Sequence, residues 1–249
     1  MKIKHILISQ PQPADPEKSP YFELGKKHNL KIDYFKFIKI EGVSAREFRK
    51  DKVYIQDHTA IIFTSRNAID HFFRISEEMR IEIPDTMKYF CVSESVAFYL
   101  QKYVQYRKRK IFHGQGSFNN LLEIIRKHKN ETYLLPCSSI HTAEIPNLLD
   151  SHSIKHHKAV IYRTVSSDLS KLDLDKYDLM VFFSPSGVAS LFKNFPDFQQ
   201  GETLIAAFGP TTAKAVEEAG MTLNIKAPTK TAPSMSMAID AFLKQHKKK

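Results

Sequence analysis

Small hydroxyl side chains recur at one kind of position in this chain, directly after short apolar runs. They occur in Thr64-Ser65, Ser93-Glu94-Ser95, Cys137-Ser138-Ser139, Ser184-Pro185-Ser186-Gly187 and Gly209-Pro210-Thr211-Thr212. Each hydroxyl can accept a hydrogen bond from the free N–H groups that open a helix. Helix starts also offer backbone donors and a positive dipole end, which suit carboxylates and phosphates. One such turn is an ordinary helix cap, whereas five of them together predict a site for an anionic small molecule.

Other kinds of site find little support in the residues. The chain contains neither G-x-G-x-x-G nor G-x-x-x-x-G-K-[ST], which argues against a nucleotide, and no G-x-S-x-G elbow. His152, His156 and His157 form the tightest histidine cluster, but it holds no carboxylate and is expected to be solvated surface. Two cysteines, Cys91 and Cys137, form neither a disulfide framework nor a C-x-x-C pair. We therefore expect no metal and no cofactor.

The charge balance favours an acidic partner. The formal net charge is +10 over 249 residues, so nucleic acid, anionic lipid or a polycarboxylate would be attracted. The basic runs Arg107–Lys110 and Lys247–Lys249 keep RNA binding open as an alternative, although such runs are usually solvated faces. The apolar stretch near the N-terminus is too short for a signal peptide or a membrane span. A cytoplasmic protein that contacts neither nucleic acid nor membrane is the expectation.

Alternating strands and helices should position the hydroxyl turns. The apolar runs predict strands at 5–9, 60–64, 89–92, 110–112, 132–135, 158–165, 179–183, 204–208 and 224–226, with an extended segment at 30–40. Amphipathic stretches predict helices at 20–29, 68–79, 95–103, 118–127, 140–151, 187–194, 212–219 and 233–246. This order implies right-handed βαβ units and parallel sheets, whose strands are apolar on both faces. Ligands of such sheets bind beyond the carboxyl ends of the strands, where the hydroxyl turns lie.

A weak internal repeat predicts two similar modules. Residues 60–69 resemble residues 179–188, and residues 89–97 resemble residues 205–213. The extended segments Leu30–Ile40 and Lys158–Val165 bracket the first copy and are candidates for two crossings between domains. We expect a discontinuous α/β domain of residues 1–36 and 167–249. A second α/β domain, 42–160, is inserted into it through linker strands 37–41 and 161–166.

Several of these segments resemble the uroporphyrinogen-III synthases. Phe182-Phe183-Ser184-Pro185-Ser186-Gly187, followed by Gly209-Pro210-Thr211-Thr212-Ala213, is similar to the two signatures in the C-terminal half of that family. Phe63-Thr64-Ser65 and Leu135-Pro136-Cys137 resemble the matching turns of the first half, and Ile161–Val165 resembles the second inter-domain strand. The similarity runs in order across nearly the whole chain.

The resemblance implies a specific activity. Members of the family have two α/β domains with the active site in the cleft between them. They convert hydroxymethylbilane, an acidic linear tetrapyrrole, into uroporphyrinogen III in tetrapyrrole and heme biosynthesis, with loss of water, inversion of ring D and no cofactor. A monomer that receives its substrate from the preceding deaminase is implied. A non-catalytic two-domain protein that clamps an anionic small molecule is the alternative.

The resemblance also assigns residues. Tyr162 matches a tyrosine proposed to help the hydroxyl group leave, and is the expected catalytic residue. The turns supply the expected substrate-binding residues, which are Ser65, Ser93, Ser95, Ser139, Ser184, Ser186, Thr211 and Thr212. Two positions depart from the family pattern. Ser93-Glu94 replaces the Gly-Pro of the second copy, and Gln10 stands where many members carry arginine.

Overall fold

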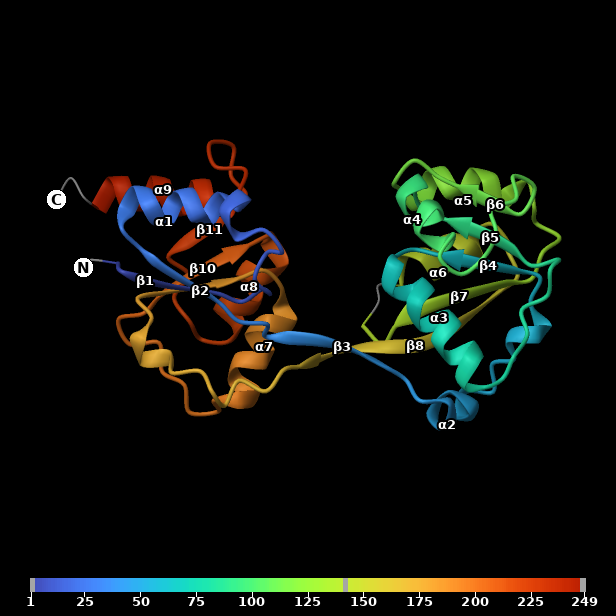
Figure 1. Cartoon of the computed structure of the whole chain (residues 1–249), viewed down its shortest axis with the longest axis horizontal. Coiled ribbons are helices and arrows are strands. Elements are labelled where there is room, and N and C mark those ends of the chain that lie inside the picture. The colour runs from blue at the N-terminus through green and yellow to red at the C-terminus, as the bar shows by residue number, and fades with distance from the viewer. Residues whose placement is uncertain (1–2, 141–142, 247–249) are drawn as a thin grey trace. The chain divides into compact units, whose positions relative to one another are not determined.

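The computed structural model describes residues 3–140 and 143–246 and divides the chain into two compact units (Figure 1). Unit 1 comprises Met1–Lys39 and Val165–Lys249, and unit 2 comprises Ile40–Thr164 between them. Each unit contains a sheet of largely parallel strands covered by helices. The predicted fold class, two α/β units with one inserted into the other, is confirmed.

Unit 1 alternates strands with helices along both of its segments. Its strands are β1 (His5–Ile8), β2 (Lys31–Tyr34), β9 (Leu179–Phe182), β10 (Leu204–Phe208) and β11 (Ile225–Ala227). Its helices are α1 (Pro20–His28), α7 (Pro185–Asn194), α8 (Pro210–Glu218) and α9 (Met235–His246), with single 3-10 turns at Pro16–Lys18 and Leu174–Lys176. The strands pair in parallel in the order β11-β10-β9-β1-β2.

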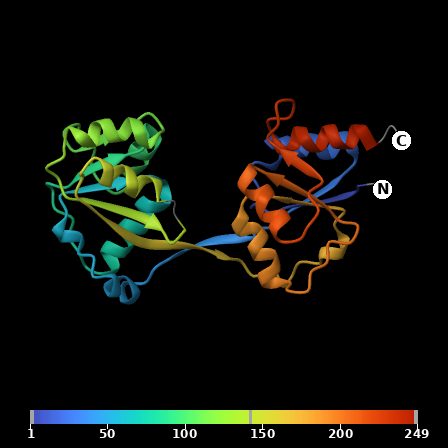
Figure 2. The ribbon, with the colours of Figure 1, turned by 180° about the vertical axis from the view of Figure 1, so that it is seen from behind.

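Helices cover both faces of the unit 1 sheet. Helices α1 and α9 pack side by side on one face, where Leu24 and Ile239 meet Ile6 and Ile8. On the other face, Leu191 of α7 is buried against the strand residues that alternate with those facing α1 and α9. Helix α8 packs beside α7 on this face. Figure 2 shows the same helices from behind. The two-sided cover explains why β9, the central strand, is apolar and buried along its whole length.

Unit 2 contains the remaining elements. Its strands are β4 (Ala60–Phe63), β5 (Lys88–Cys91), β6 (Ile111–His113), β7 (Tyr133–Ser138) and β8 (His156–Ser166), and β3 (Ile38–Gly42) lies beside β8. Its helices are α2 (Ala45–Phe48), α3 (Arg66–Glu78), α4 (Glu94–Leu100), α5 (Phe118–Arg126) and α6 (Glu144–Ser151), with 3-10 turns at Arg49–Asp51 and Ile55–Asp57. The sheet order is β3-β8-β7-β4-β5-β6, and β4 to β8 pair in parallel.

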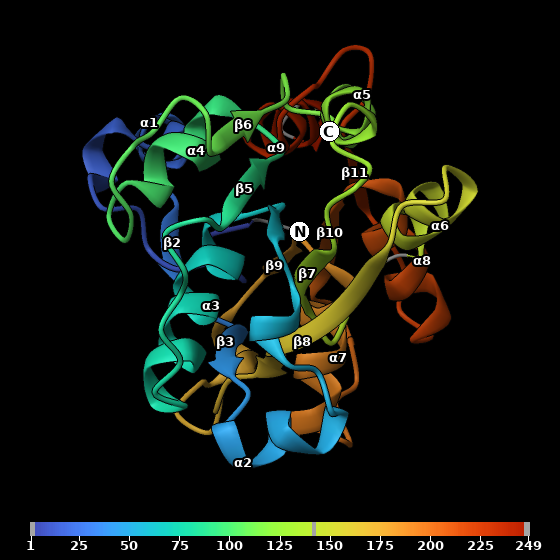
Figure 3. The same ribbon diagram turned by 90° about the vertical axis from the view of Figure 1, so that its right-hand side faces the viewer.

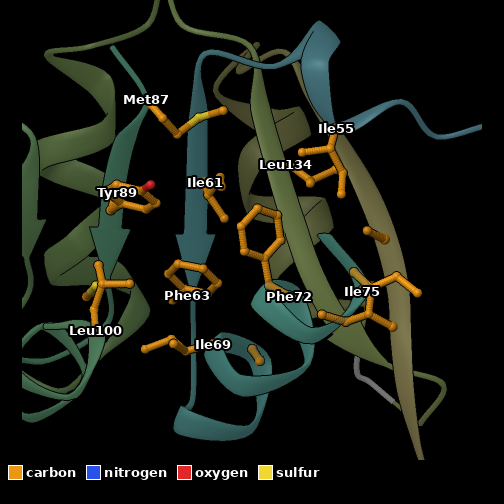
Figure 4. Close-up of a cluster of buried hydrophobic side chains, with 14 of the residues drawn as sticks. Ile55, Ile61, Phe63, Ile69, Phe72, Ile75, Met87, Tyr89, Leu100 and Leu134 are labelled. Atoms are coloured by element: carbon orange, nitrogen blue, oxygen red, sulfur yellow. The ribbon is translucent and has the colours of Figure 1, made fainter. Parts of the chain in front are cut away.

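The larger core cluster of unit 2 lies between the sheet and α3. Phe63 and Ile61 of β4 face Ile69 and Phe72 of α3, and all four side chains are fully buried (Figure 4). On the opposite face, α5 and α6 pack over Ile62, so α3 and α6 lie on opposite sides of the sheet (Figure 3). Burial of this face fixes the position of α3, which begins at one of the hydroxyl turns.

The two units repeat one strand order. Counted from β4, unit 2 has the order 3-2-1-4-5, with β3 added at its edge. Counted from β9 and continuing from β11 to β1, unit 1 has the same order. This matches β4 with β9 and β5 with β10, the pairs that the sequence repeat predicts. In both units the strand order reverses beside strand 1, between β4 and β7 and between β9 and β1.

The boundaries between the units fall inside both predicted linkers, between Lys39 and Ile40 and between Thr164 and Val165. The second linker, 161–166, is also the end of β8, and its residues up to Thr164 belong to unit 2. The reason is the core, in which Ile161 is 1% exposed and Tyr162 8% exposed. Strand pairing with β7 reaches Tyr162, which a single-strand pattern cannot reveal. Helix α6 begins at Glu144 and not at Ile140, and His141 and Thr142 lie outside the described residues.

Within the histidine cluster the His156 side chain is only 8% exposed, which corrects the expectation of solvated surface there, whereas His152 and His157 are exposed as expected. The exposed His157 contacts a buried histidine. Its Nδ1 lies 2.8 Å from Nε2 of His58, which is 5% exposed, and Nδ1 of His58 lies 2.8 Å from the Tyr54 carbonyl oxygen. Because the carbonyl can only accept, His58 donates from Nδ1. In its neutral form His58 then accepts at Nε2 from His157. Burial lowers the pKa of His58, the hydrogen bond to the Tyr54 carbonyl opposes this, and His157 adds to the lowering.

Stability should therefore fall in mild acid. The unfolded chain binds a proton at His58 near pH 6.5 and the folded chain only at lower pH. The contribution of His58 is complete above about pH 6.5 and is lost as the pH falls below that value. We expect a loss of about 1 kcal/mol, the size of one hydrogen bond. Thermal unfolding between pH 5 and 7.5 measures it, and His58→Leu should be less stable but show a flatter pH response. An identical response in both proteins would contradict the assignment.

Candidate active site

In unit 2 the candidate residues surround the point where the strand order reverses. Strands β4 and β7 are neighbours, and their carboxyl ends carry Ser65 and Ser139. Crevices beyond such points are where open α/β sheets bind ligands. Ser65 is the N-cap of α3, and its Oγ accepts a hydrogen bond of 3.2 Å from the amide of Ala68. Sheet order and helix capping thus place two predicted residues at one edge.

Tyr162 of β8 joins this group. Its hydroxyl oxygen lies 3.5 Å from Oγ of Ser65, and its carbonyl oxygen accepts from the amide of Ser139 at 3.0 Å. The pairing of β7 with β8 shifts register between Cys137 and Ser138, so that Ser138 stands opposite Tyr162. Such irregularities re-aim side chains at strand ends. The structure therefore brings together Tyr162, Ser65 and Ser139, which lie far apart in the sequence.

Ser93 and Ser95 lie one strand further along the same edge. They follow β5, the neighbour of β4, and their Oγ atoms are 3.0 Å apart. Oγ of Ser93 also caps α4 by accepting from the amide of Val96 at 3.4 Å. No direct side-chain contact with Tyr162 is seen for either serine within the described residues. Their predicted role would therefore concern a more distant part of a ligand.

The reversal point of unit 1 presents similar groups. Ser184 follows β9 and caps α7, with Oγ accepting from the amide of Gly187 at 3.1 Å, and Ser186 lies half-buried in the first turn. A Cβ atom at Gly187 would lie 3.5 Å from Oγ of Ser184 and 3.8 Å from Oγ of Ser9. Ser9, at the end of β1, is therefore part of this group, which sequence reasoning missed. The position of Ser9 at the end of a predicted strand was the signal that could have found it. No helix cap follows directly after this strand, unlike the other hydroxyl turns.

The threonine turn of unit 1 offers backbone donors. Gly209, the N-cap of α8, has φ of 88°, a conformation that favours glycine, and has no capping side chain. Pro210 has no N–H, so the amides of Thr211 and Thr212 are the free donors of the first turn. The Thr211 side chain is exposed, whereas that of Thr212 is 1% exposed. A ligand can reach the Thr211 hydroxyl directly, while the Thr212 side chain packs inside the unit.

A cavity of 1090 Å³ in unit 1 lies away from these turns. Its lining includes Lys4, Lys31 and Leu204, near the amino ends of β1, β2 and β10. The hydroxyl turns follow the opposite, carboxyl ends of the strands. The candidate site is therefore defined by converging donors and not by this cavity.

Neither a metal cluster nor a membrane helix is found in residues 3–140 and 143–246. No group of three or more His, Cys, Asp or Glu side chains there has a geometry that could hold a metal ion. None of the described helices combines the length and apolar character that a membrane span requires. Both cysteines are buried free thiols, and burial raises the pKa of Cys91 to about 12 and that of Cys137 to about 11.

Comparison with protein families decides which family this site belongs to. The family model described as uroporphyrinogen-III synthase HemD matches residues 26–236, which is most of both units. The chain belongs to the uroporphyrinogen-III synthase family. Enzymes of this family are lyases that cyclise hydroxymethylbilane. No curated protein sequence matches the chain significantly.

Solved structures of uroporphyrinogen-III synthases share the fold. The enzyme from Helicobacter pylori 26695 is 18% identical with a TM-score of 0.59, over 98% of this chain and 100% of that chain. A mutant of the enzyme from the extreme thermophile Thermus thermophilus is 14% identical with a TM-score of 0.52, over 99% of this chain and 100% of that chain. At these identities the likeness concerns the fold alone.

Proposed function

We propose that this uroporphyrinogen-III synthase uses Tyr162 as its proton donor and the hydroxyl turns of both units to hold hydroxymethylbilane. The observation that carries the proposal is the meeting of Tyr162, Ser65 and Ser139 at the carboxyl edge of the unit 2 sheet. In a member of this family, a tyrosine at a ligand-binding edge has an evident task, because the substrate must lose a hydroxyl group.

Tyr162 acts at the first step of the proposed reaction. Its O–H donates a proton to the hydroxyl on the ring A methylene. The C–O bond then breaks, water departs, and an azafulvenium cation is formed. Ring D then attacks through its substituted carbon, and the spiro intermediate fragments and recloses with ring D reversed. The proton that the closed macrocycle releases restores Tyr162. A positioned proton donor contributes about 10²–10⁴-fold to such a step.

Ser65 supports this donation. Its Oγ already accepts from the amide of Ala68, so its own O–H is free to point at the Tyr162 oxygen. That arrangement leaves the Tyr162 proton for the substrate and stabilises the phenolate that forms after transfer. The distance of 3.5 Å lies at the outer limit of a hydrogen bond, and catalytic hydrogen bonds often tighten when substrate binds.

The remaining turns hold the carboxylates. The amides of Thr211 and Thr212, the hydroxyls of Ser184 and Ser186, and the turn Ser93–Ser95 offer donors at helix starts. Binding at several points bends the linear substrate into a reactive shape. Hydroxymethylbilane closes unaided to the non-inverted isomer, so a thousand-fold preference requires about 4 kcal/mol. Positioning alone can supply up to about 7–11 kcal/mol.

Incubating the protein with freshly made hydroxymethylbilane tests the function. Chromatographic separation of the isomers should show uroporphyrinogen III as the main product. If only the spontaneous type I isomer forms, the proposed activity is wrong. Saturable substrate binding without turnover would then favour the non-catalytic clamp, and steeply salt-dependent RNA binding would favour the nucleic-acid alternative.

Replacing Thr211 by alanine should weaken substrate capture. The exposed hydroxyl is lost while the buried Thr212 continues to pack, so we expect KM to rise about tenfold at nearly constant kcat, as for one hydrogen bond to a charged group. Initial-rate kinetics of type III formation measure the effect. Thr222→Ala, which changes an exposed threonine after α8, serves as the matched control. Equal KM values in both variants would remove Thr211 from the site.

Three finer proposals accompany the activity. We propose that the enzyme works as a monomer, in the cytoplasm, and that it receives its substrate from the preceding deaminase. The buried free thiols of Cys91 and Cys137 support a reducing compartment. Sedimentation analysis of the purified enzyme, alone and mixed with that deaminase, tests the first and the third.

A further inference from the structure

The hydroxyl of Tyr162 anchors its ring only weakly. It makes the long contact with Ser65, and the strand pairing is irregular beside it. A phenol ring in this position can keep a defined plane only if neighbouring side chains hold it. The ring of His71 on α3 stacks on that of Tyr162, with ring centroids 5.2 Å apart and planes at 20°.

The His71 ring is itself held in one orientation. Nε of Arg74, one turn further along α3, donates to Nδ1 of His71 at 3.3 Å. Nδ1 must therefore be an acceptor, and the ring proton lies on Nε2. Burial lowers the pKa of His71, with the Arg74 charge adding to the effect and Asp70 opposing it. The ring that faces Tyr162 is thus a neutral imidazole of defined tautomer.

Arg74 connects this ring to the backbone beside Tyr162. Its Nη2 donates to the carbonyl oxygen of Val43 at 2.6 Å and to that of Ile161 at 3.4 Å, and Ile161 directly precedes Tyr162. Its Nη1 donates to Glu78 at 2.6 Å. Gly42 permits this approach, because a Cβ there would lie 2.6 Å from Cζ of Arg74. One guanidinium therefore positions both the His71 ring and the strand that carries the tyrosine.

We propose that His71 is a positioning residue for Tyr162, whose stacked ring, oriented by Arg74, keeps the phenol hydroxyl beside Ser65 during proton donation. The inference rests on the proposed role of Tyr162. Sequence reasoning missed His71, although it lies three residues after Ala68 and four before Ile75, on the buried face of α3. That spacing is the signal that could have found it.

Substitutions can separate the two contacts of His71. His71→Phe keeps an aromatic ring over Tyr162 but loses the acceptor for Arg74, whereas His71→Asn keeps an acceptor near Nδ1 but loses the ring. We expect His71→Asn and His71→Ala to lower kcat for type III formation by roughly three- to tenfold, the size of one aromatic contact, with KM within about twofold. His71→Phe should retain most of the wild-type kcat.

A second arm tests whether His71 acts through Tyr162. In a Tyr162→Phe background, His71→Ala should cause little further loss, because residues that act as a unit are not additive. His128→Ala is the matched control, since His128 lies 4.6 Å from Phe112 in a ring contact on the other face of unit 2. It should cost stability while leaving kcat unchanged, and urea unfolding should show that every variant folds.

Several outcomes would overturn the inference. These are an unchanged kcat in His71→Ala, a full additional loss in the Tyr162→Phe background, or His71→Phe as slow as His71→Ala. The last would mean that the ring nitrogens of His71, and not its stacked ring, are responsible for the effect. If Tyr162→Phe is as active as the wild type, the proposed role of Tyr162 is wrong. This variant is therefore measured before the His71 variants.

Discussion

Replacing Tyr162 by phenylalanine is expected to slow the formation of uroporphyrinogen III by about 100-fold or more. Only the hydroxyl is removed, so the ring keeps its stack on His71 and its place in the core. The enzyme loses the proton for the departing hydroxyl group but keeps the donors that bind the carboxylates. We therefore expect kcat to fall and KM to change little, and isomer-resolved initial rates measure both.

A second tyrosine provides the control for this experiment. Tyr133 is fully buried, and its hydroxyl donates to the carbonyl oxygen of His128 at 3.0 Å. Tyr133→Phe should lower the free energy of unfolding by about 1 kcal/mol or more, because a buried acceptor loses its partner, without changing kcat. Tyr162→Phe should show the reverse. An active Tyr162→Phe enzyme would reduce Tyr162 to a packing residue, and the hydroxyl turns would have to act without it.

Replacing Phe72 by alanine is expected to destabilise unit 2 by about 3–5 kcal/mol. The ring is fully buried between α3 and the sheet, and it meets the Phe63 ring edge-on at 5.6 Å and that of Phe73 at 5.1 Å (Figure 4). The cavity cannot collapse easily, because the strands on one side and the helix on the other are already closely packed. Urea denaturation followed by circular dichroism measures the loss.

The effect should depend on burial and not on the residue type. Phe98, on α4, is 73% exposed, and Phe98→Ala should change the free energy of unfolding by less than about 0.5 kcal/mol. Phe72→Leu should cost less than Phe72→Ala because most of the volume is kept. A loss below about 1 kcal/mol in Phe72→Ala would mean that α3 is not held by this core. The positions of Ser65, His71 and Arg74 would then need another explanation.

The sequence alone predicted the parts of this protein that depend on local pattern. Apolar runs and helix caps located the strands and the hydroxyl turns, and Ser65, Ser93 and Ser184 each cap a helix as expected. The resemblance to the family is found in those turns. It can therefore be recognised even though the overall sequence identity to other members is low. Local interactions between residues three positions apart are sufficient for these features.

Tertiary structure decided which of these residues meet. Strand order placed Ser65, Ser139 and Tyr162 at one edge, because parallel strands that are far apart in the chain become neighbours only in the sheet. Packing turned the Thr212 side chain inward and paired His157 with His58, although both lie in polar-looking segments. Burial and cross-strand contacts depend on segments that are distant in the sequence. The pattern of neighbouring residues therefore cannot predict them. The contact of His71 with Tyr162, on which the further inference rests, belongs to this second class.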